Sequence, residues 1–314
     1  MRKKQIKKEL LHMSIFIHFV FFFYFIKLMP VFTYPAISRL LGFISFSLMG
    51  STRERIKKNL KIAYGNTFNY LERRRINIDI FSNVIMSFCE LIRVTKIEED
   101  KILAMASIEG EEKLQSALKE GNGVIGVCSH MGNFPLLETI LVKKGYPANV
   151  IVKDPTAEYL AKFCRNLSKQ HKIPYISKKD IKATIKEAQQ WLSSNKGLLS
   201  FYIDQHAGNG LSVMFFDRKV FAPTGAAVFA RKYNCPAIGI FSYRIKNGSH
   251  KIIIEGPYPL KKTNNVTEDI KDNTTQFMQR VEHYVKLYPD QWFSWLHRRS
   301  EEHTSELQSP SVIS

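Results

Sequence analysis

The sequence predicts an α/β protein with a mostly parallel sheet, flanked by helices and preceded by a helical N-terminal region. From residue 107 onward, short apolar runs alternate with helical patterns, as in parallel sheets that are covered on both faces. Before residue 107, apolar residues recur at helical spacing among basic ones. Hydrophobic residues make up 45% of the 314 residues, so the chain can bury a full core.

The N-terminus combines a basic flank with a long apolar stretch. Residues 1–9 carry five Lys and Arg, and residues 10–30 are apolar over a length that can span a bilayer. We therefore expect residues 1–30 to be a basic flank and a membrane-anchor helix, with the flank on the cytoplasmic side. A cleaved signal peptide is the alternative, but no small-residue cleavage site follows. His12 and His18 dilute the apolar run, which leaves an interfacial or domain-packed position open.

The remaining chain reads as one domain over residues 31–299, helical over 31–106 and α/β over 107–299. Ser51 or Thr52 is a good N-cap for its first basic helix. Helices are expected over residues 52–64, 71–94, 112–120, 134–143, 157–170, 180–194 and 224–233. Buried strands are expected over residues 123–129, 148–152, 197–203, 236–244 and 251–256.

Charge and cysteine content restrict the partners. The formal net charge of +18 indicates an anionic partner, either nucleic acid, phospholipid headgroups or an acidic protein. The aromatic residues near the N-terminus favour a membrane, and no nucleic-acid-binding pattern is recognisable, so we expect no nucleic-acid partner. The four cysteines lack CxxC spacing, which predicts reduced thiols and no metal site.

The last residues differ in character from everything before them. The string RSEEHTSELQS is the translation of a nucleotide sequence that resembles a common sequencing adapter. We interpret residues 300–314 as a non-native tail from adapter read-through, with a natural polar tail as the alternative. We therefore read no motif from this segment.

The first candidate site segment is SHMGNFPLLE, residues 129–138, which directly follows a predicted strand. Catalytic groups of open α/β sheets gather at the carboxyl ends of strands, and His130 stands at such an end. A single histidine is more often structural, but this position favours catalysis. Asn133 is a plausible N-cap and Pro135 suits a first helical turn. Gly132 would let a substrate approach the backbone closely.

The second segment spans residues 201–225, in which Asp204 and Gln205 stand at the end of another predicted strand. It continues through a glycine-containing loop to two phenylalanines and the basic Arg218, and Thr224 stands at a helix start. This composition indicates a binding loop for a ligand that is both apolar and anionic. A surface hairpin is the alternative.

The third segment is YPDQWFSWLHRR, residues 288–299, which joins aromatic to basic side chains. A membrane-interface patch, a phosphate site and a core helix are all compatible with it. Four blocks occur in a characteristic order: RERIKKNLKIAYG, SHMGN, the run from DQ to PTG with FFDR inside it, and PDQWFSWLHRR. With the N-terminal anchor, they make the chain resemble the bacterial lipid A biosynthesis late acyltransferases (lauroyl and myristoyl transferases) over about residues 10–299, and their relatives that acylate other glycolipids.

The resemblance implies acyl transfer from acyl carrier protein or coenzyme A, with no further cofactor, to a glycolipid hydroxyl. It places the protein at the cytoplasmic face of the bacterial inner membrane. His130 would be the general base that takes the hydroxyl proton during attack on the thioester. The family has an acid five residues after this histidine to orient the ring, but this chain has Pro135 there. Glu138, one helical turn later, and Asp204 are jointly expected to replace it.

Further residues are expected to bind the substrates. Phosphate groups of the acceptor or of the phosphopantetheine arm would need basic partners, for which the candidates are Lys153, Arg218, Arg244 and Arg298. The other candidate substrate-binding residues are Gly132, Asn133, Gln205 and Thr224. The basic surface suits the acidic acyl carrier protein, and we expect a monomer. Another lipid acceptor (phosphoglycolipid, aminolipid or lysophospholipid) and a catalytically inactive lipid-binding relative stay open as alternatives.

Overall fold

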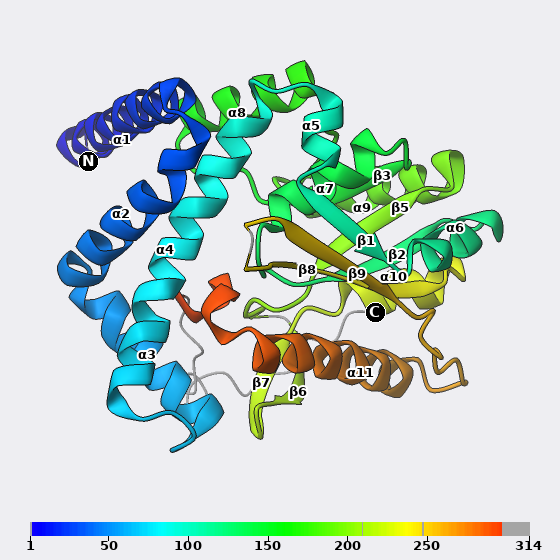
Figure 1. Ribbon diagram of the computed structural model, residues 1–314. Helices are drawn as coiled ribbons and strands as arrows, with labels where there is room; N and C mark the ends of the chain where they lie inside the picture. Colours follow the sequence, from blue (N-terminus) through cyan, green and yellow to red (C-terminus); the bar gives the residue numbers. More distant parts are fainter. Residues whose placement is uncertain (1, 209, 247, 297–314) are drawn as a thin grey trace.

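A seven-stranded sheet lies at the centre of the structure (Figure 1). The computed structural model describes residues 2–208, 210–246 and 248–296. The strand order is β1-β9-β8-β2-β5-β3-β4, and only the pair of β8 and β9 is antiparallel. The strands are β1 (Ala106–Glu109), β2 (Val124–Cys128), β3 (Ala148–Val152), β4 (Ile176–Ser177), β5 (Leu198–Tyr202), β8 (Ala237–Arg244) and β9 (His250–Glu255). The predicted fold class is confirmed.

The long apolar strands lie where the sequence predicts them, and the short ones do not stand out from it. β2 is buried along its whole length, as expected for a central strand that helices cover on both faces. β4 has only two residues and β1 only four, too few to create a recognisable pattern. A separate antiparallel pair, β6 (Leu211–Phe215) and β7 (Arg218–Ala222), realises the surface hairpin that stood as the alternative for residues 201–225.

Four helices, α4, α7, α9 and α11, begin directly after a residue whose side chain caps them. The helices are α1 (Arg2–Leu28), α2 (Tyr34–Leu48), α3 (Gly50–Tyr64), α4 (Tyr70–Val94), α5 (Glu99–Leu103), α6 (Glu111–Lys119), α7 (Phe134–Lys143), α8 (Glu158–His171), α9 (Ile181–Gln190), α10 (Gly225–Tyr233) and α11 (Val266–Leu287). Four short helical turns complete the set: η1 (Val31–Thr33), η2 (Trp191–Asn195), η3 (Pro289–Gln291) and η4 (Phe293–Leu296). Asn133 caps α7 as predicted, because its side chain accepts a hydrogen bond from the Leu136 amide. α3 begins at Gly50, so Ser51 and Thr52 lie inside the helix instead of capping it.

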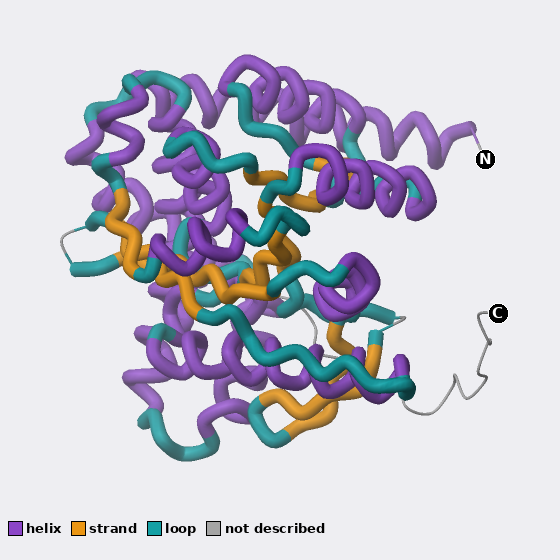
Figure 2. The backbone as a smooth tube through the Cα atoms, turned by 90° about the vertical axis from the view of Figure 1, so that its right-hand side faces the viewer, coloured by secondary structure: helices purple, strands orange, loops and turns teal. Residues whose placement is uncertain are grey.

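Helices cover both faces of the sheet (Figure 2). On one face, α6 and α7 bury side chains such as Leu114 and Ile140 against the strands. On the other face, α10 and α11 do the same with side chains such as Ala226 and Val281. Full burial of one Leu, Ile or Val side chain contributes about 1.5–3 kcal/mol, so these two clusters supply much of the driving force for folding.

The helix α1 packs on the domain along one face. Its Phe23 and Ile26 are buried. The ring of Phe163 in α8 meets Phe19 and Phe23, with centroid distances of 5.7 and 5.2 Å. The domain-packed position that the sequence left open is therefore realised for this side of the helix.

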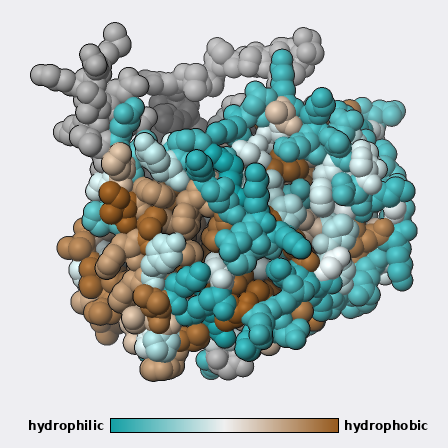
Figure 3. Space-filling view, turned by 90° about the horizontal axis from the view of Figure 1, so that it is seen from above, coloured by the Kyte–Doolittle hydropathy of each residue, from teal (hydrophilic) through white to brown (hydrophobic). Residues whose placement is uncertain are grey.

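The other side of the N-terminal region is apolar and exposed, and we call it the apolar N-terminal face. Brown, apolar side chains gather there, on the side of the molecule where Figure 1 places α1 and α2 (Figure 3). The exposed apolar residues of this face include Phe21, Tyr24, Phe25, Leu28, Phe32, Leu40, Phe43 and Leu48. Among the described residues, Val31–Leu48 is the segment long and apolar enough to cross a membrane, and His12–Leu28 is apolar but shorter. The stretch that meets the length requirement thus follows the expected anchor at residues 10–30.

Candidate active site

The register of two parallel strands brings a histidine and a carboxylate together. β2 and β5 pair with Cys128 opposite Tyr202. His130 lies two residues after Cys128, and Asp204 lies two residues after Tyr202. Both residues therefore lie at the carboxyl edge of the sheet. His130 Nδ1 lies 2.7 Å from Asp204 Oδ1, and the His130 backbone N–H donates to Oδ2 over 2.8 Å. The carboxylate therefore holds both the ring and the main chain of the histidine.

The carboxylate of Asp204 is buried and well supplied with hydrogen-bond donors. Trp292 Nε1 donates to Oδ2 over 2.6 Å, and the Ser294 hydroxyl donates to the same oxygen over 3.3 Å. Burial alone would raise the pKa of Asp204. The charge of a protonated His130 and the hydrogen bonds from His130 and Trp292 outweigh burial and hold the pKa below its ordinary value. Asp204 is therefore an anion at neutral pH.

The outer nitrogen of His130 is free to act. With Nδ1 donating to Asp204, Nε2 carries the lone pair. Within the described residues, Nε2 has no hydrogen-bond partner, and the side chain is 16% exposed. The rings of Phe134 and Tyr202 wall the imidazole, with centroid distances of 4.8 and 4.9 Å. The arrangement can take up a proton from a group that approaches Nε2.

Glu138 was jointly expected to hold the histidine, but its carboxyl group turns to other partners. Ser200 and Tyr202 donate to it over 3.2 and 3.0 Å. Burial raises the pKa of Glu138 to about 7, against the two hydrogen bonds, which lower it. Asp204 is therefore the carboxylate partner of His130, and Glu138 binds the hydroxyl group of Tyr202.

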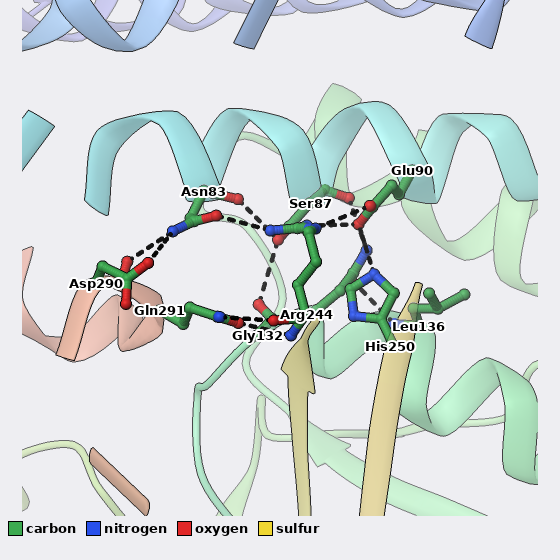
Figure 4. Close-up of polar contacts among 10 residues, drawn as sticks. Asn83, Ser87, Glu90, Gly132, Leu136, Arg244, His250, Asp290 and Gln291 are labelled. Carbon is green, nitrogen blue, oxygen red and sulfur yellow. Dashed lines mark hydrogen bonds and ion pairs between the residues drawn. The ribbon is translucent and has the colours of Figure 1, made fainter. Parts of the chain in front are cut away.

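Arg244, an expected anion-binding residue, is used inside the protein (Figure 4). Its guanidinium donates to both carboxylate oxygens of Glu90, over 3.1 and 2.7 Å, and to Asn83 over 2.8 Å. His250 and Asn133 also reach Glu90 Oε2, over 3.0 and 2.8 Å. Burial would raise the pKa of Glu90, but His250 and Arg244 lower it to about 2. Because Arg244 and Asn133 are engaged in this buried cluster, neither is placed to bind a substrate.

The segment after α11 is tied to the histidine loop through its main chain. The Phe293 amide donates to the His130 carbonyl over 2.8 Å, and the Gly132 amide donates to the Gln291 carbonyl over 2.9 Å. Asn83 in turn donates to the Asp290 carbonyl over 2.9 Å and to its carboxylate over 3.2 Å. The blocks SHMGN and PDQWFSW, far apart in sequence, thus form one site.

A comparison with known protein families identifies the family of this chain. A sequence model described as bacterial lipid A biosynthesis acyltransferase matches residues 3–301, nearly the whole chain. The chain belongs to that acyltransferase family. The resemblance drawn from its motifs is thereby confirmed. No individually curated protein matches it significantly.

Gly132 of this acyltransferase has a packing role. Its φ is +57°, and a Cβ placed there would lie 2.5 Å from the Ser242 carbonyl oxygen of β8. The position of a Cβ is therefore filled by the neighbouring strand, while Gly132 itself also lines an apolar pocket beside α4. Only glycine combines this backbone conformation with such a close approach.

The other expected substrate-binding residues of the acyltransferase do not all lie together. Gln205 and Arg218 line one cavity together with Asp204. Lys153 is exposed after β3, which β5 separates from β2, and Thr224 stands at the start of α10. Arg298 lies outside the described residues, as does the interpreted tail over 300–314.

Sequence reasoning missed four side chains of the site: Phe134, Tyr202, Trp292 and Ser294. Trp292 and Ser294 lie inside the third candidate segment, whose aromatic character was the available signal. Their role depends on contacts to Asp204, which no spacing within one segment indicates.

Proposed function

We propose that this acyltransferase moves a fatty acyl group from a thioester to a hydroxyl of a glycolipid resembling a lipid A precursor. Acyl carrier protein or coenzyme A would carry the thioester, and the reaction would take place at the cytoplasmic face of the inner membrane. Family membership supports the reaction class, and the apolar N-terminal face supports a membrane location. The single observation that carries the chemistry is the His130–Asp204 pair at the sheet edge.

In this proposal, His130 is the general base and Asp204 holds it. Nε2 takes the proton from the acceptor hydroxyl while the hydroxyl oxygen attacks the thioester carbonyl carbon. The C–S bond then breaks, the ester remains, and the imidazolium returns its proton to the leaving thiolate. The anionic Asp204 stabilises the imidazolium. Because the acceptor oxygen attacks the thioester directly, no covalent acyl-enzyme is needed.

We propose the pocket beside α4 as the place of the acyl chain. This apolar pocket has about 520 Å³ of empty space, open solvent at its mouth included. Its wall includes Phe134, whose ring also contacts His130. Apolar walls with few polar groups suit a hydrocarbon chain, because the chain leaves water on entry. The remaining apolar part of the wall consists mainly of Ile80, Val84, Phe88, Leu91 and Phe293.

Acyl transfer by the purified full-length chain in detergent tests the proposal. The assay supplies a labelled acyl thioester and a hydroxylated glycolipid to the wild type, His130→Ala and Asp204→Asn. General-base catalysis contributes about 10²–10⁴-fold, so each variant should lose at least about 100-fold in kcat. His283→Ala on α11, an exposed histidine away from the site, is the matched control and should keep full activity.

Two results would overturn the proposal. Full turnover in His130→Ala would exclude this histidine as the base. Complete inactivity of the folded wild type with every thioester and glycolipid supplied would exclude acyl transfer and would favour a lipid-binding relative.

A further inference from the structure

A cavity lies beneath the β6–β7 hairpin, bounded also by α3, the loop after β5 and the segment after α11. This hairpin cavity has about 800 Å³ of empty space, open solvent at its mouth included. Its aromatic wall includes the buried rings of Phe215, Phe216 and Trp295. Asp204 and Ser294 also line it, so the cavity extends to Asp204, whose fully buried side chain holds His130.

The charges around the hairpin cavity favour an anion. Arg218 and Lys219 line it and are exposed. Among the described residues of the lining, Asp204 is the only acid, and His130 engages its carboxylate. His206 adds an imidazole ring to the same lining.

Two other arginines of the protein form ion pairs with carboxylates of the same chain. Arg231 is paired with Asp269 over 2.9 Å, and Arg280 with Glu255 over 2.6 Å. In the part of the chain that the structure describes, Arg218 has no such partner. Its charge is therefore available to a ligand.

The turn of the hairpin holds this cation in a defined place. Phe216 and Asp217 have φ values of +50° and +56°, a left-handed conformation that aspartate adopts more readily than most residues and phenylalanine rarely adopts. The buried ring of Phe216 packs on Trp295, with a centroid distance of 6.0 Å. The backbone amide of Phe216 donates a hydrogen bond to the Glu282 carboxylate over 2.6 Å. These contacts offset the strain, so Arg218 begins β7 from an anchored turn.

We propose that the hairpin cavity binds a phosphate ester whose attached chain runs along the aromatic wall toward His130, with Arg218 and Lys219 on the phosphate. The planar fork of Arg matches phosphate oxygens, and Lys adds a second positive charge. The inference rests on the proposed function for its source of ligand: the phosphopantetheine arm of the donor or a phosphorylated glycolipid acceptor. Both carry the same chemistry, so the experiment has an arm for each.

Binding without turnover tests this proposal on the full-length chain in detergent. Isothermal titration calorimetry compares 4′-phosphopantetheine with pantetheine, and a phosphorylated glycolipid with its dephosphorylated form. Arg218→Gln/Lys219→Gln should weaken the binding of one phosphorylated probe by about tenfold or more and leave its phosphate-free form unchanged. Arg218→Lys/Lys219→Arg, which keeps both charges, should bind within a few-fold of the wild type.

The controls separate this inference from the proposed reaction. Lys119→Gln, which changes an exposed cation at the end of α6 away from the cavity, should bind every probe as the wild type does. His130→Ala should lose turnover but keep phosphate binding. A loss confined to phosphopantetheine assigns the cavity to the donor, and a loss confined to the glycolipid assigns it to the acceptor. Equal binding of both phosphorylated probes by the wild type and the Gln double variant would overturn the inference, whether or not the protein transfers acyl groups.

Discussion

The protonation of Glu138 should make the stability of the protein depend on pH. The Tyr202 hydroxyl has one proton and two nearby acceptors, Glu138 Oε1 at 3.0 Å and the Phe134 carbonyl at 3.2 Å. If Glu138 is protonated, it donates to the Tyr202 oxygen, and Tyr202 donates to Phe134. With neutral Glu138, both of these hydrogen bonds can form at the same time. With ionised Glu138, the Tyr202 hydroxyl donates to the carboxylate, and the Phe134 carbonyl loses its hydrogen bond from Tyr202.

The sign of the resulting pH dependence follows from the raised pKa. In the unfolded chain Glu138 titrates near 4.5, and in the folded chain burial raises its pKa to about 7. The folded state therefore binds the proton more tightly. Its contribution to stability is full below pH 4.5 and disappears as the pH rises through 7. At about 1.4 kcal/mol for each pH unit between the two values, Glu138 should cost the protein about 2–3 kcal/mol of unfolding free energy between pH 5 and pH 8.

Glu138→Gln should remove this loss, because its amide keeps the neutral hydrogen-bonding pattern at every pH. Denaturant unfolding in detergent would give the free energy of unfolding at pH 5, 6, 7 and 8 for the wild type, Glu138→Gln and Glu187→Gln. Glu187 is an exposed glutamate of α9, so its variant should follow the wild type. Other titrating groups cancel in the difference between curves. Parallel pH curves for the wild type and Glu138→Gln would refute the reasoning.

Three further changes test the packing, the buried charges and the membrane surface. Gly132→Ala should lower the free energy of unfolding by about 2 kcal/mol or more, because the new Cβ would clash with the β8 backbone and Gly132 has a positive φ. An unchanged midpoint in denaturant unfolding would contradict this. Arg244→Gln should cost about 3–5 kcal/mol, because it leaves the Glu90 carboxylate buried without its cation, and Arg244→Gln combined with Glu90→Gln should recover part of the loss. Leu40→Glu/Phe43→Glu on α2 should reduce flotation with anionic vesicles without changing the thermal midpoint; equal flotation would argue against the apolar N-terminal face as a membrane surface.

Much of the architecture follows from local patterns in the sequence. The strands β2, β5 and β8 are apolar runs, and α7 carries its own start signal in Asn133 and Pro135. By contrast, α11 carries a mixed, largely polar sequence and does not stand out before the core is known. Its buried stripe is defined only by packing against the sheet.

The site could be predicted only in part, because its partners are set by pairing between strands. His130 and Asp204 could both be chosen as strand-end residues, but their contact depends on the register of β2 with β5. Glu138 was attractive because it lies on the helix after the histidine, and tertiary packing turns it to Tyr202 instead. Arg244 was expected to bind a ligand because its ion-pair partner Glu90 lies 154 residues away in the sequence. No residue pattern near Arg244 indicates this pair.

The parallel register of β2 and β5 also bears on how the protein reaches its active form. Asp204 lies 74 residues after His130, and β3, β4, α8 and α9 all lie between them in the chain. Contacts across such separations form slowly, because a long loop must close before any pairing stabilises it. A slip of one residue would bring Ile203 or Gln205 opposite His130 and turn the carboxylate to the other face. During refolding, the return of acyl transfer should therefore lag behind helix formation and follow the docking of these two strands.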